Sequence, residues 1–364
     1  MRIENVESFV VRLPFDTGDK AKEWRGRRTL DYVLLRIDTD AGISGWGDAF
    51  GYGALRATKA AVDHMIAPAL IGRDARDIAG ISYTLQQSNH IWGRYGVTMF
   101  AISGVDIALW DIAGKAAGMP LHQLLGGKAH DSLPAYASLM KCPDPETVAG
   151  RTAAAGAEGY RYVKLHETTV PAVRAAREAA GADIAIMIDT NCPWSPQEAA
   201  AMAAKFRPFD PHWLEEPIFP PEDFAALAQL QARSGIPIAA GENACTAFEF
   251  KRMFDARAVT YAQPSVTKVG GISEFRKIVA LAETAAVTVV PHSPYFGPGF
   301  LATLQLLAAM PRPSMVERFY CTPEARLVGD WTEARNGAFR VPDGPGLGCD
   351  PDPDALRDYR DKDA

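Results

Sequence analysis

Residues 212–220 read HWLEEPIFP, a short apolar run that ends in two adjacent carboxylates, Glu215 and Glu216, directly before a proline. Burial of a carboxylate is costly unless a cation or hydrogen bonds compensate for the lost water. Similar runs that end in polar residues lie on both sides: residues 184–189 read IAIMID and residues 236–242 read IPIAAGE. The glutamate pair therefore belongs to a repeated pattern, and this repeat decides the fold.

The repeat extends over most of the chain. Short apolar runs begin at eight positions, 22 to 29 residues apart: Leu133, Tyr160, Ile184, Trp213, Ile236, Ala258, Val287 and Ser314. Alanine-rich, helix-favouring segments such as residues 195–206 (SPQEAAAMAAKF) lie between them. Apolar strands that alternate with helices are typical of a parallel sheet covered on both faces. Eight units predict a TIM-type barrel. The alternative is an open doubly wound sheet, but no GxGxxG turn follows an early strand to favour it.

The N-terminal third follows another pattern. Residues 2–14 (RIENVESFVVRLP) and 30–50 (LDYVLLRIDTDAGISGWGDAF) are typical of antiparallel strands, with TDAGI as a turn. We expect a separate α+β domain over residues 1–125 and the barrel over residues 126–320. The C-terminal segment, residues 321–364, contains a stretch rich in Gly, Pro and Asp. We expect it to pack back onto the first domain.

The composition favours a soluble cytoplasmic protein. Hydrophobic residues make up 48% of the chain and charged residues 23%, as in ordinary globular proteins. The net charge of −6, without a basic block, argues against nucleic-acid binding. The N-terminus has acids where a signal peptide needs basic residues, and we expect no apolar run to approach the roughly 20 residues that span a bilayer. The five cysteines form no CxxC pair for zinc or redox chemistry.

Three carboxylates close three consecutive predicted strands. Asp189, Glu215 and Glu242 are 26 and 27 residues apart, about one strand-helix unit each. The active site of a TIM barrel lies at the C-terminal ends of its strands, so these groups should converge and repel one another. A hard divalent cation relieves that repulsion, and oxygen ligands suit Mg²⁺. A single acid at a strand end would be explained more simply as a cap of the next helix. Three acids at equivalent positions of consecutive strands instead predict a Mg²⁺ site, with Glu216 and Asn191 as supporting neighbours.

Basic groups lie at two other strand ends. Lys164 and His166, two residues apart, can face the same way at the end of the second strand, and His292 follows the seventh, across the barrel mouth. A lone histidine there is more often structural, but its place opposite Lys164 favours catalysis. The arrangement suits removal of a proton α to a carboxylate, giving a metal-stabilised enediolate. A lysine beside the metal is expected to lose its proton more easily.

These features resemble the mandelate racemase branch of the enolase superfamily over essentially the whole chain. The stretches that carry the resemblance are AISGVDIALWDIAGKAAGMPLHQLLGG (101–127), VKLH (163–166), IDTN (188–191), WLEEP (213–217), GEN (241–243), TKVGG (267–271) and VER (316–318). The resemblance implies an α+β capping domain over a modified (β/α)₇β barrel. It also implies Mg²⁺ held by Asp189, Glu215 and Glu242, and abstraction of the proton next to a substrate carboxylate.

The sequence departs from the family pattern at two positions. The family often carries Lys-x-Lys at the second strand, whereas this chain has Lys164-Leu165-His166, so the role of base falls on Lys164 or His166. Mandelate racemase-like members pair the seventh-strand histidine with an aspartate on the sixth strand, and other branches place a lysine there. This chain has Ser265. A serine supplies no charge, so we expect His292 to be a weaker base, more often neutral, and suited to an acid role.

Two further residues are assigned through the resemblance. Lys268 belongs to the KxGG element and is more supporting than catalytic. Glu317 resembles the eighth-strand glutamate that donates, when protonated, to the substrate carboxylate. The competing explanation for Glu317 is a partly exposed surface glutamate.

The favoured function is an Mg²⁺-dependent acid-sugar (aldonate or aldarate) dehydratase, a lyase. The alternatives are a racemase, epimerase or cycloisomerase that uses the same intermediate, and a catalytically silent metal-binding paralogue. Specificity is expected from two loops of the first domain that contain Trp24, Arg25 and Tyr52, although a solvated basic loop would explain the arginine equally well. The expected partners are a small carboxylate substrate and other copies of the chain, as a dimer or octamer.

Overall fold

The computed structural model describes residues 1–17, 29–312 and 314–362. An antiparallel sheet forms the first part of the chain, with the strand order β12-β1-β2-β3. Its strands are β1 (Ile3–Asp16), β2 (Thr29–Thr39), β3 (Ser44–Ala49) and β12 (Thr322–Pro323). The predicted TDAGI turn joins β2 to β3: the Thr39 N–H donates to Ile43 O, and Gly42 has a φ of 70°. The expected antiparallel strands are therefore confirmed.

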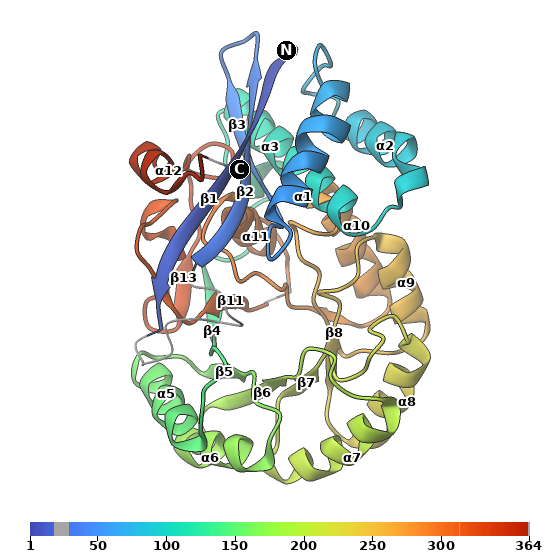
Figure 1. Cartoon of the computed structure of the whole chain (residues 1–364), viewed down its shortest axis with the longest axis vertical. Helices are drawn as coiled ribbons and strands as arrows, with labels where there is room; N and C mark the ends of the chain where they lie inside the picture. The colour runs from blue at the N-terminus through green and yellow to red at the C-terminus, as the bar shows by residue number, and fades with distance from the viewer. Residues whose placement is uncertain (18–28, 313, 363–364) are drawn as a thin grey trace.

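Helices pack against this sheet or against one another beside it (Figure 1). They are α1 (Leu55–Ala60), the π-helical turn η1 (Ala61–Ile66), the 3₁₀ turns η2 (Ala67–Ala69) and η3 (His90–Trp92), α2 (Ile78–Ser88), α3 (Val97–Ala117) and α4 (Leu121–Leu124). The contact between β3 and α3 requires glycine, because a Cβ on Gly47 would overlap Gly104 O of the helix. This close approach holds the start of the following loop, which carries Phe50 and Tyr52, against the rest of the molecule.

Helix α3 is 21 residues long and has a mean hydropathy of 1.4 in its most apolar window. By length and composition it is apolar enough to cross a membrane, so the expectation that no segment of the chain reaches this limit was wrong. In the structure 78% of that window is buried inside the protein, which is typical of a core helix.

The predicted barrel strands are confirmed at all eight positions within the described residues. They are β4 (Ser132–Ser138), β5 (Tyr162–Leu165), β6 (Ala185–Asp189), β7 (Trp213–Glu215), β8 (Ile238–Ala240), β9 (Tyr261–Ala262), β10 (Thr288–Val289) and β11 (Val316–Phe319). They form one curled parallel sheet in the order β10-β9-β8-β7-β6-β5-β4-β11. The strands β10 and β11 end this order, and the Ser314 hydroxyl joins these two ends by donating to Val289 O at 2.5 Å.

Helices cover the outside of the curled sheet (Figure 1). They are α5 (Pro145–Ala157), α6 (Val170–Ala180), α7 (Pro196–Phe206) with the 3₁₀ turn η4 (Arg207–Phe209), α8 (Phe224–Ser234), α9 (Ala247–Asp255), α10 (Gly271–Thr284) and α11 (Pro298–Ala308). A separate buried cluster of Tyr136, Met187, Trp213, Ala239 and Val290 fills the barrel interior. Because side chains two residues further along a strand point to the same face, the next inward layer contains Lys164, Asp189 and Glu215.

The C-terminal segment contacts both parts of the molecule. Strand β12 pairs with β1, and after α12 (Pro353–Tyr359) the Asp361 N–H donates to Val10 O of β1. Between them, β13 (Ala338–Arg340), which follows the 3₁₀ turn η5 (Gly329–Thr332), pairs antiparallel with the barrel strand β4. The segment thus contacts strand β1 of the first sheet and strand β4 of the barrel, and the sequence did not indicate the second contact.

Candidate active site

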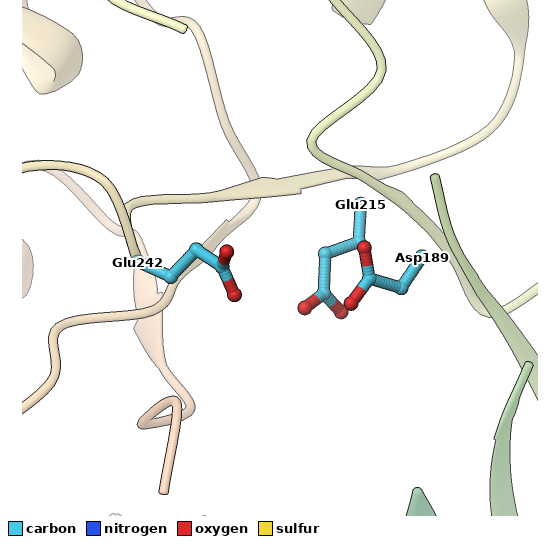
Figure 2. A group of neighbouring side chains, drawn as sticks. All are labelled: Asp189, Glu215 and Glu242. Atoms are coloured by element: carbon cyan, nitrogen blue, oxygen red, sulfur yellow. The ribbon is translucent and has the colours of Figure 1, made fainter. Parts of the chain in front are cut away.

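The three predicted metal-binding carboxylates converge at the C-terminal ends of neighbouring strands. Asp189 and Glu215 face each other in register on β6 and β7, and Glu242 follows β8. One oxygen from each carboxylate lies within 4.8 Å of the others. Figure 2 shows the oxygens of Glu242 on one side of a shared space and those of Asp189 and Glu215 on the other.

The donor set fits a hard cation. It consists of carboxylate oxygens alone, with Asp189 and Glu215 buried and Glu242 partly open to solvent. Asp189 is held in place because its Oδ1 accepts from the Asn191 backbone N–H at 3.0 Å and from the Asn191 side-chain amide. These are the ligands that Mg²⁺ prefers, with an open side for water or substrate oxygens.

Lys164 lies within this acidic group. Its Nζ is 2.8 Å from Glu215 Oε1, 3.0 Å from Glu317 Oε1 and 3.2 Å from Asp189 Oδ2. Burial disfavours the ammonium, but the carboxylates, Glu215 foremost, outweigh burial and raise the pKa of Lys164 well above its ordinary value. The direction is opposite to the one expected from the sequence, because three carboxylates surround the Lys164 ammonium.

The two adjacent glutamates have different surroundings. Glu215 accepts a hydrogen bond from Trp213 Nε1 at 2.8 Å. Glu216 adopts a left-handed φ of 43°, which turns its side chain away, and its Oε1 accepts from the Gly241 N–H at 2.9 Å. Gly241 precedes Glu242, so Glu216 holds the backbone that places the third carboxylate. Burial, with the nearby charge of Glu242, raises the pKa of Glu216 to about 7.

His166 is the second basic group on the β5 side. Its Nδ1 lies 2.5 Å from Leu139 O and its Nε2 lies 3.2 Å from Asp189 Oδ2. Since a carbonyl accepts only, Nδ1 carries a proton, and Nε2 is the nitrogen that exchanges a proton at the site. Burial opposes the charge, but the Asp189 carboxylate outweighs it and raises the pKa of His166.

His292 lies on the opposite side of the carboxylate group. Its Nε2 is 3.1 Å from Glu242 Oε2. Its Nδ1 is 3.3 Å from Ser265 Oγ and 3.5 Å from the Tyr295 hydroxyl, and the two hydroxyls hydrogen-bond each other. Burial lowers the pKa of His292, so its neutral form predominates. Two neutral hydroxyls therefore occupy the side of the ring where the family resemblance implies an aspartate.

Tyr295 was missed by sequence reasoning. It follows His292 by three residues in a proline-containing loop, and only this short spacing could have pointed to a contact between them. Burial raises the pKa of the Tyr295 hydroxyl well above its ordinary value, so it remains protonated. Tyr295 is therefore a permanent hydrogen-bond donor beside the imidazole.

Glu317 is buried at the end of β11, with 2% of its surface exposed, which excludes a surface glutamate. Its Oε2 accepts from the Ser293 N–H at 3.0 Å. Burial would raise its pKa, but the Lys164 ammonium outweighs burial and the pKa of Glu317 is lowered. The resemblance implies a protonated Glu317, whereas the contact with the Lys164 ammonium favours the carboxylate form.

These groups line a cavity of about 190 Å³. Its polar wall includes Lys164, His166, Asp189, Asn191, Glu242, Lys268, His292 and Glu317, and its other wall includes Phe50, Tyr52, Pro294 and Phe319. Tyr52 donates to Pro294 O at 3.0 Å. A larger groove of about 760 Å³ lies elsewhere, lined by residues of α2, α9 and α10, and contains none of the predicted site residues.

The structure thus brings together the predicted residues from six strand ends. Ser265 and Lys268 also lie at this site, beside His292 and in the cavity wall respectively. Of the predicted specificity residues, Tyr52 lines the cavity, whereas Trp24 and Arg25 lie outside the described residues.

Comparison with known proteins agrees with this geometry. The sequence matches the family description "Mandelate racemase / muconate lactonizing enzyme, N-terminal domain" over residues 21–126 and "Enolase C-terminal domain-like" over residues 148–355. It is 34% identical to D-galactarolactone cycloisomerase of Agrobacterium fabrum, covering 99% of both chains. It is 32% identical to D-galactonate dehydratase of Ralstonia nicotianae, over 88% of this chain and 89% of the relative.

A solved structure extends the comparison to the cofactor. L-Talarate dehydratase from Polaromonas sp. JS666, complexed with Mg and L-glucarate, has a TM-score of 0.85 and 30% identity, over 99% of this chain and 98% of that one. The acidic group of the present chain is suited to the same ion. By its sequence, its two matched domains and its fold, the chain belongs to the mandelate racemase/muconate lactonizing enzyme family of the enolase superfamily.

Proposed function

We propose that the protein is an Mg²⁺-dependent acid-sugar dehydratase that removes the proton α to a carboxylate and then expels a hydroxyl group as water. The observation that carries this proposal is the placement of proton-moving groups on two sides of the carboxylates. Lys164 and His166 contact Asp189 at one side, and His292 contacts Glu242 at the other. A substrate held between them meets a base on one face and an acid on the other.

Asp189, Glu215 and Glu242 are the proposed ligands of the ion. Bound Mg²⁺ would supply positive charge that stabilises the negative charge developing on the substrate carboxylate, and it would weaken the hold of these carboxylates on nearby protons. Glu216 and Asn191 support the arrangement by fixing the Gly241 backbone and the Asp189 side chain.

We assign the base to His166. Its Nδ1 proton is committed to Leu139 O, which leaves Nε2 to take the α-proton. Lys164 is less suited, because its Nζ has three carboxylate oxygens within 3.2 Å, which occupy its N–H groups. Lys164 then holds the substrate carboxylate and supplies positive charge beside it, and Glu317 holds the Lys164 ammonium in place.

His292 is the proposed acid, and its hydroxyl partners explain why. A hydroxyl that donates to Nδ1 places the single proton of a neutral imidazole on Nε2, where it faces Glu242 Oε2 and the cavity. An aspartate would do the reverse, accepting from Nδ1–H and leaving Nε2 as a base. Ser265 and Tyr295 thus favour His292 as the proton donor to a departing hydroxyl group.

A cycloisomerase is the second candidate, because a relative with 34% identity over 99% of the chain bears that name. In that reaction His292 would protonate the intermediate carbon, or a departing ring oxygen, in place of a hydroxyl group. Incubation with Mg²⁺ and a panel of mono- and diacid sugars distinguishes the two. A keto acid formed with loss of water supports the dehydratase, an isomer of unchanged mass supports the cycloisomerase, and inertness of the whole panel contradicts both.

We also propose that residues 1–125 cap the barrel of residues 126–320, with residues 321–364 completing the cap. Phe50 and Tyr52, which reach the cavity, support this division. A homo-oligomer and a cytoplasmic location remain predictions from the resemblance and from the N-terminal sequence.

A further inference from the structure

Lys268 is a buried lysine in the wall of the active-site cavity, with 6% of its surface exposed. Its Nζ lies over the rings of Phe50 and Phe100, 4.8 and 5.9 Å from their centroids. Among the described residues no carboxylate oxygen lies within 4.0 Å of this Nζ. The cavity's other lysine, Lys164, has three carboxylates within that distance.

An ammonium in this position is incompletely compensated. Aromatic faces attract a cation, but they offset only part of the cost of removing it from water. A buried charge is ordinarily paired or hydrogen-bonded. Because Lys268 opens onto the cavity, the missing partner is most simply supplied by whatever occupies the cavity.

The position of Lys268 within the cavity indicates which part of a substrate it meets. It follows β9 in a loop whose preceding residue, Thr267, accepts a hydrogen bond from the Phe50 N–H at 3.3 Å. Lys268 therefore lies where the barrel meets the first domain. The proposed carboxylate site, with Asp189 and Lys164, is instead built on the barrel strands β5 and β6. A substrate whose reacting carboxylate lies on the barrel side presents its other end to Lys268.

We propose that Lys268 is a specificity-determining residue that binds a second carboxylate, so that the preferred substrate is an acid sugar with a carboxylate at each end. This rests on the proposed function and names its substrate class. A full negative charge, rather than a hydroxyl group, is the partner that an unpaired buried ammonium favours most. A purely structural lysine, clamped between the two phenylalanine rings, is the competing explanation.

The test uses two six-carbon acids of identical configuration at C2 to C5, one with a carboxylate at C6 and the other with a hydroxymethyl group. We expect the wild type to prefer the diacid in kcat/KM. Lys268→Met, which keeps the length and packing of the side chain, should reduce kcat/KM for the diacid about 10- to 100-fold, mainly through KM, and that for the monoacid less than about 3-fold. Lys268→Arg should retain most of the preference.

Lys251→Met is the matched control, since Lys251 is an exposed lysine paired with Asp255 and its loss changes the net charge equally. It should leave both values unchanged. An equal loss on both acids in Lys268→Met, or a wild-type preference for the monoacid, would overturn the inference and leave the proposed function standing.

Calorimetric binding of the two acids in the presence of Mg²⁺ separates the inference from catalysis. The ratio of the two Kd values reports on Lys268 even if neither acid is turned over, and the wider panel of acid sugars then decides the proposed function. A diacid preference that disappears in Lys268→Met supports the inference, and equal Kd values in the wild type contradict it.

Discussion

Ser265 Oγ lies 3.3 Å from His292 Nδ1, at the position where the resemblance to mandelate racemase-like enzymes implies an aspartate. The hydroxyl of Tyr295 reinforces this contact. A neutral partner lets Nε2 keep its proton while the imidazole is uncharged, so the acid role of His292 does not depend on a charged ring. In our account, a neutral partner at position 265 makes His292 the acid of a dehydratase. A carboxylate partner would instead make His292 the second base of a racemase.

Ser265→Asp should convert His292 from a fixed acid into a titrating group. Burial lowers the pKa of His292 in the wild type, and a carboxylate at position 265 should raise it. Above the raised pKa the variant loses the Nε2 proton, so its dehydration rate should fall as the pH rises, whereas the wild type keeps that proton. A pH profile of kcat measures this, and profiles that coincide for the two proteins would contradict the tautomer assignment.

His166→Ala should reduce kcat about 10²- to 10⁴-fold, the usual contribution of a general base. Mg²⁺ affinity should change little, because His166 contacts Asp189 but is not a proposed ligand.

Lys164→Met should also abolish turnover while Mg²⁺ still binds. Proton exchange at the substrate α-carbon distinguishes their roles: His166→Ala should bind the substrate without exchange, whereas Lys164→Met should bind it weakly. Exchange retained in His166→Ala would remove it as the base.

Glu215→Gln should weaken Mg²⁺ binding by more than about 100-fold. Loss of a residue that only supports a metal ligand typically lowers metal affinity about 10- to 100-fold, and loss of a ligand itself should cost more. Glu216→Gln, which disturbs only the support of Gly241, should fall in that smaller range. Glu178, an exposed residue on α6, provides the control Glu178→Gln. Calorimetric titration with Mg²⁺ compares the three variants. Normal Mg²⁺ binding by Glu215→Gln would show that Glu215 is not a ligand.

Asp106 links stability to pH. It lies on α3, and its Oδ1 accepts from the Ser273 N–H of α10 at 2.9 Å, while burial raises its pKa from 3.8 to about 7. A raised pKa means that the stabilisation is complete below pH 3.8 and is lost as the pH rises through about 7. At about 1.4 kcal/mol per pKa unit the ceiling of this loss is about 4 kcal/mol.

Asp106→Asn should therefore flatten the pH dependence of stability, because the amide oxygen can still accept from Ser273 but carries no charge. Between pH 5 and pH 8 the Tm of the wild type should fall relative to that of the variant. Thermal denaturation at several pH values measures the difference, and a constant Tm gap over this range would show that Asp106 does not titrate there.

Much of the fold could be predicted because buried parallel strands have a simple signature. The barrel strands are short, mostly apolar runs, and polar residues such as Asp189 and Glu215 lie at or just after their ends, so both the strand and the edge at which it ends can be located. The pairing of β13 with β4 could not be predicted, because its three residues carry no comparable pattern and the contact is set by tertiary packing.

The site residues at or just after the strand ends were predicted, whereas contacts that depend on the path of a loop were missed. Tyr295 reaches His292 only through the path of a loop that contains Pro294, and the contact of Glu216 with Gly241 depends on a left-handed φ. The direction in which the pKa values of Lys164 and Glu317 shift could not be predicted from the sequence either. Their pKa values depend on a mutual distance of 3.0 Å, which a sequence does not contain.

The central claim is that the protein removes the proton α to a substrate carboxylate. Proton NMR of acid sugars incubated with the protein and Mg²⁺ in D₂O tests it most directly. Our account predicts that one configuration loses its α-proton signal as a keto acid forms, that chelation of Mg²⁺ stops this, and that His166→Ala prevents it. Conversion of a substrate with its α-proton retained, or unchanged conversion without Mg²⁺, would contradict the account.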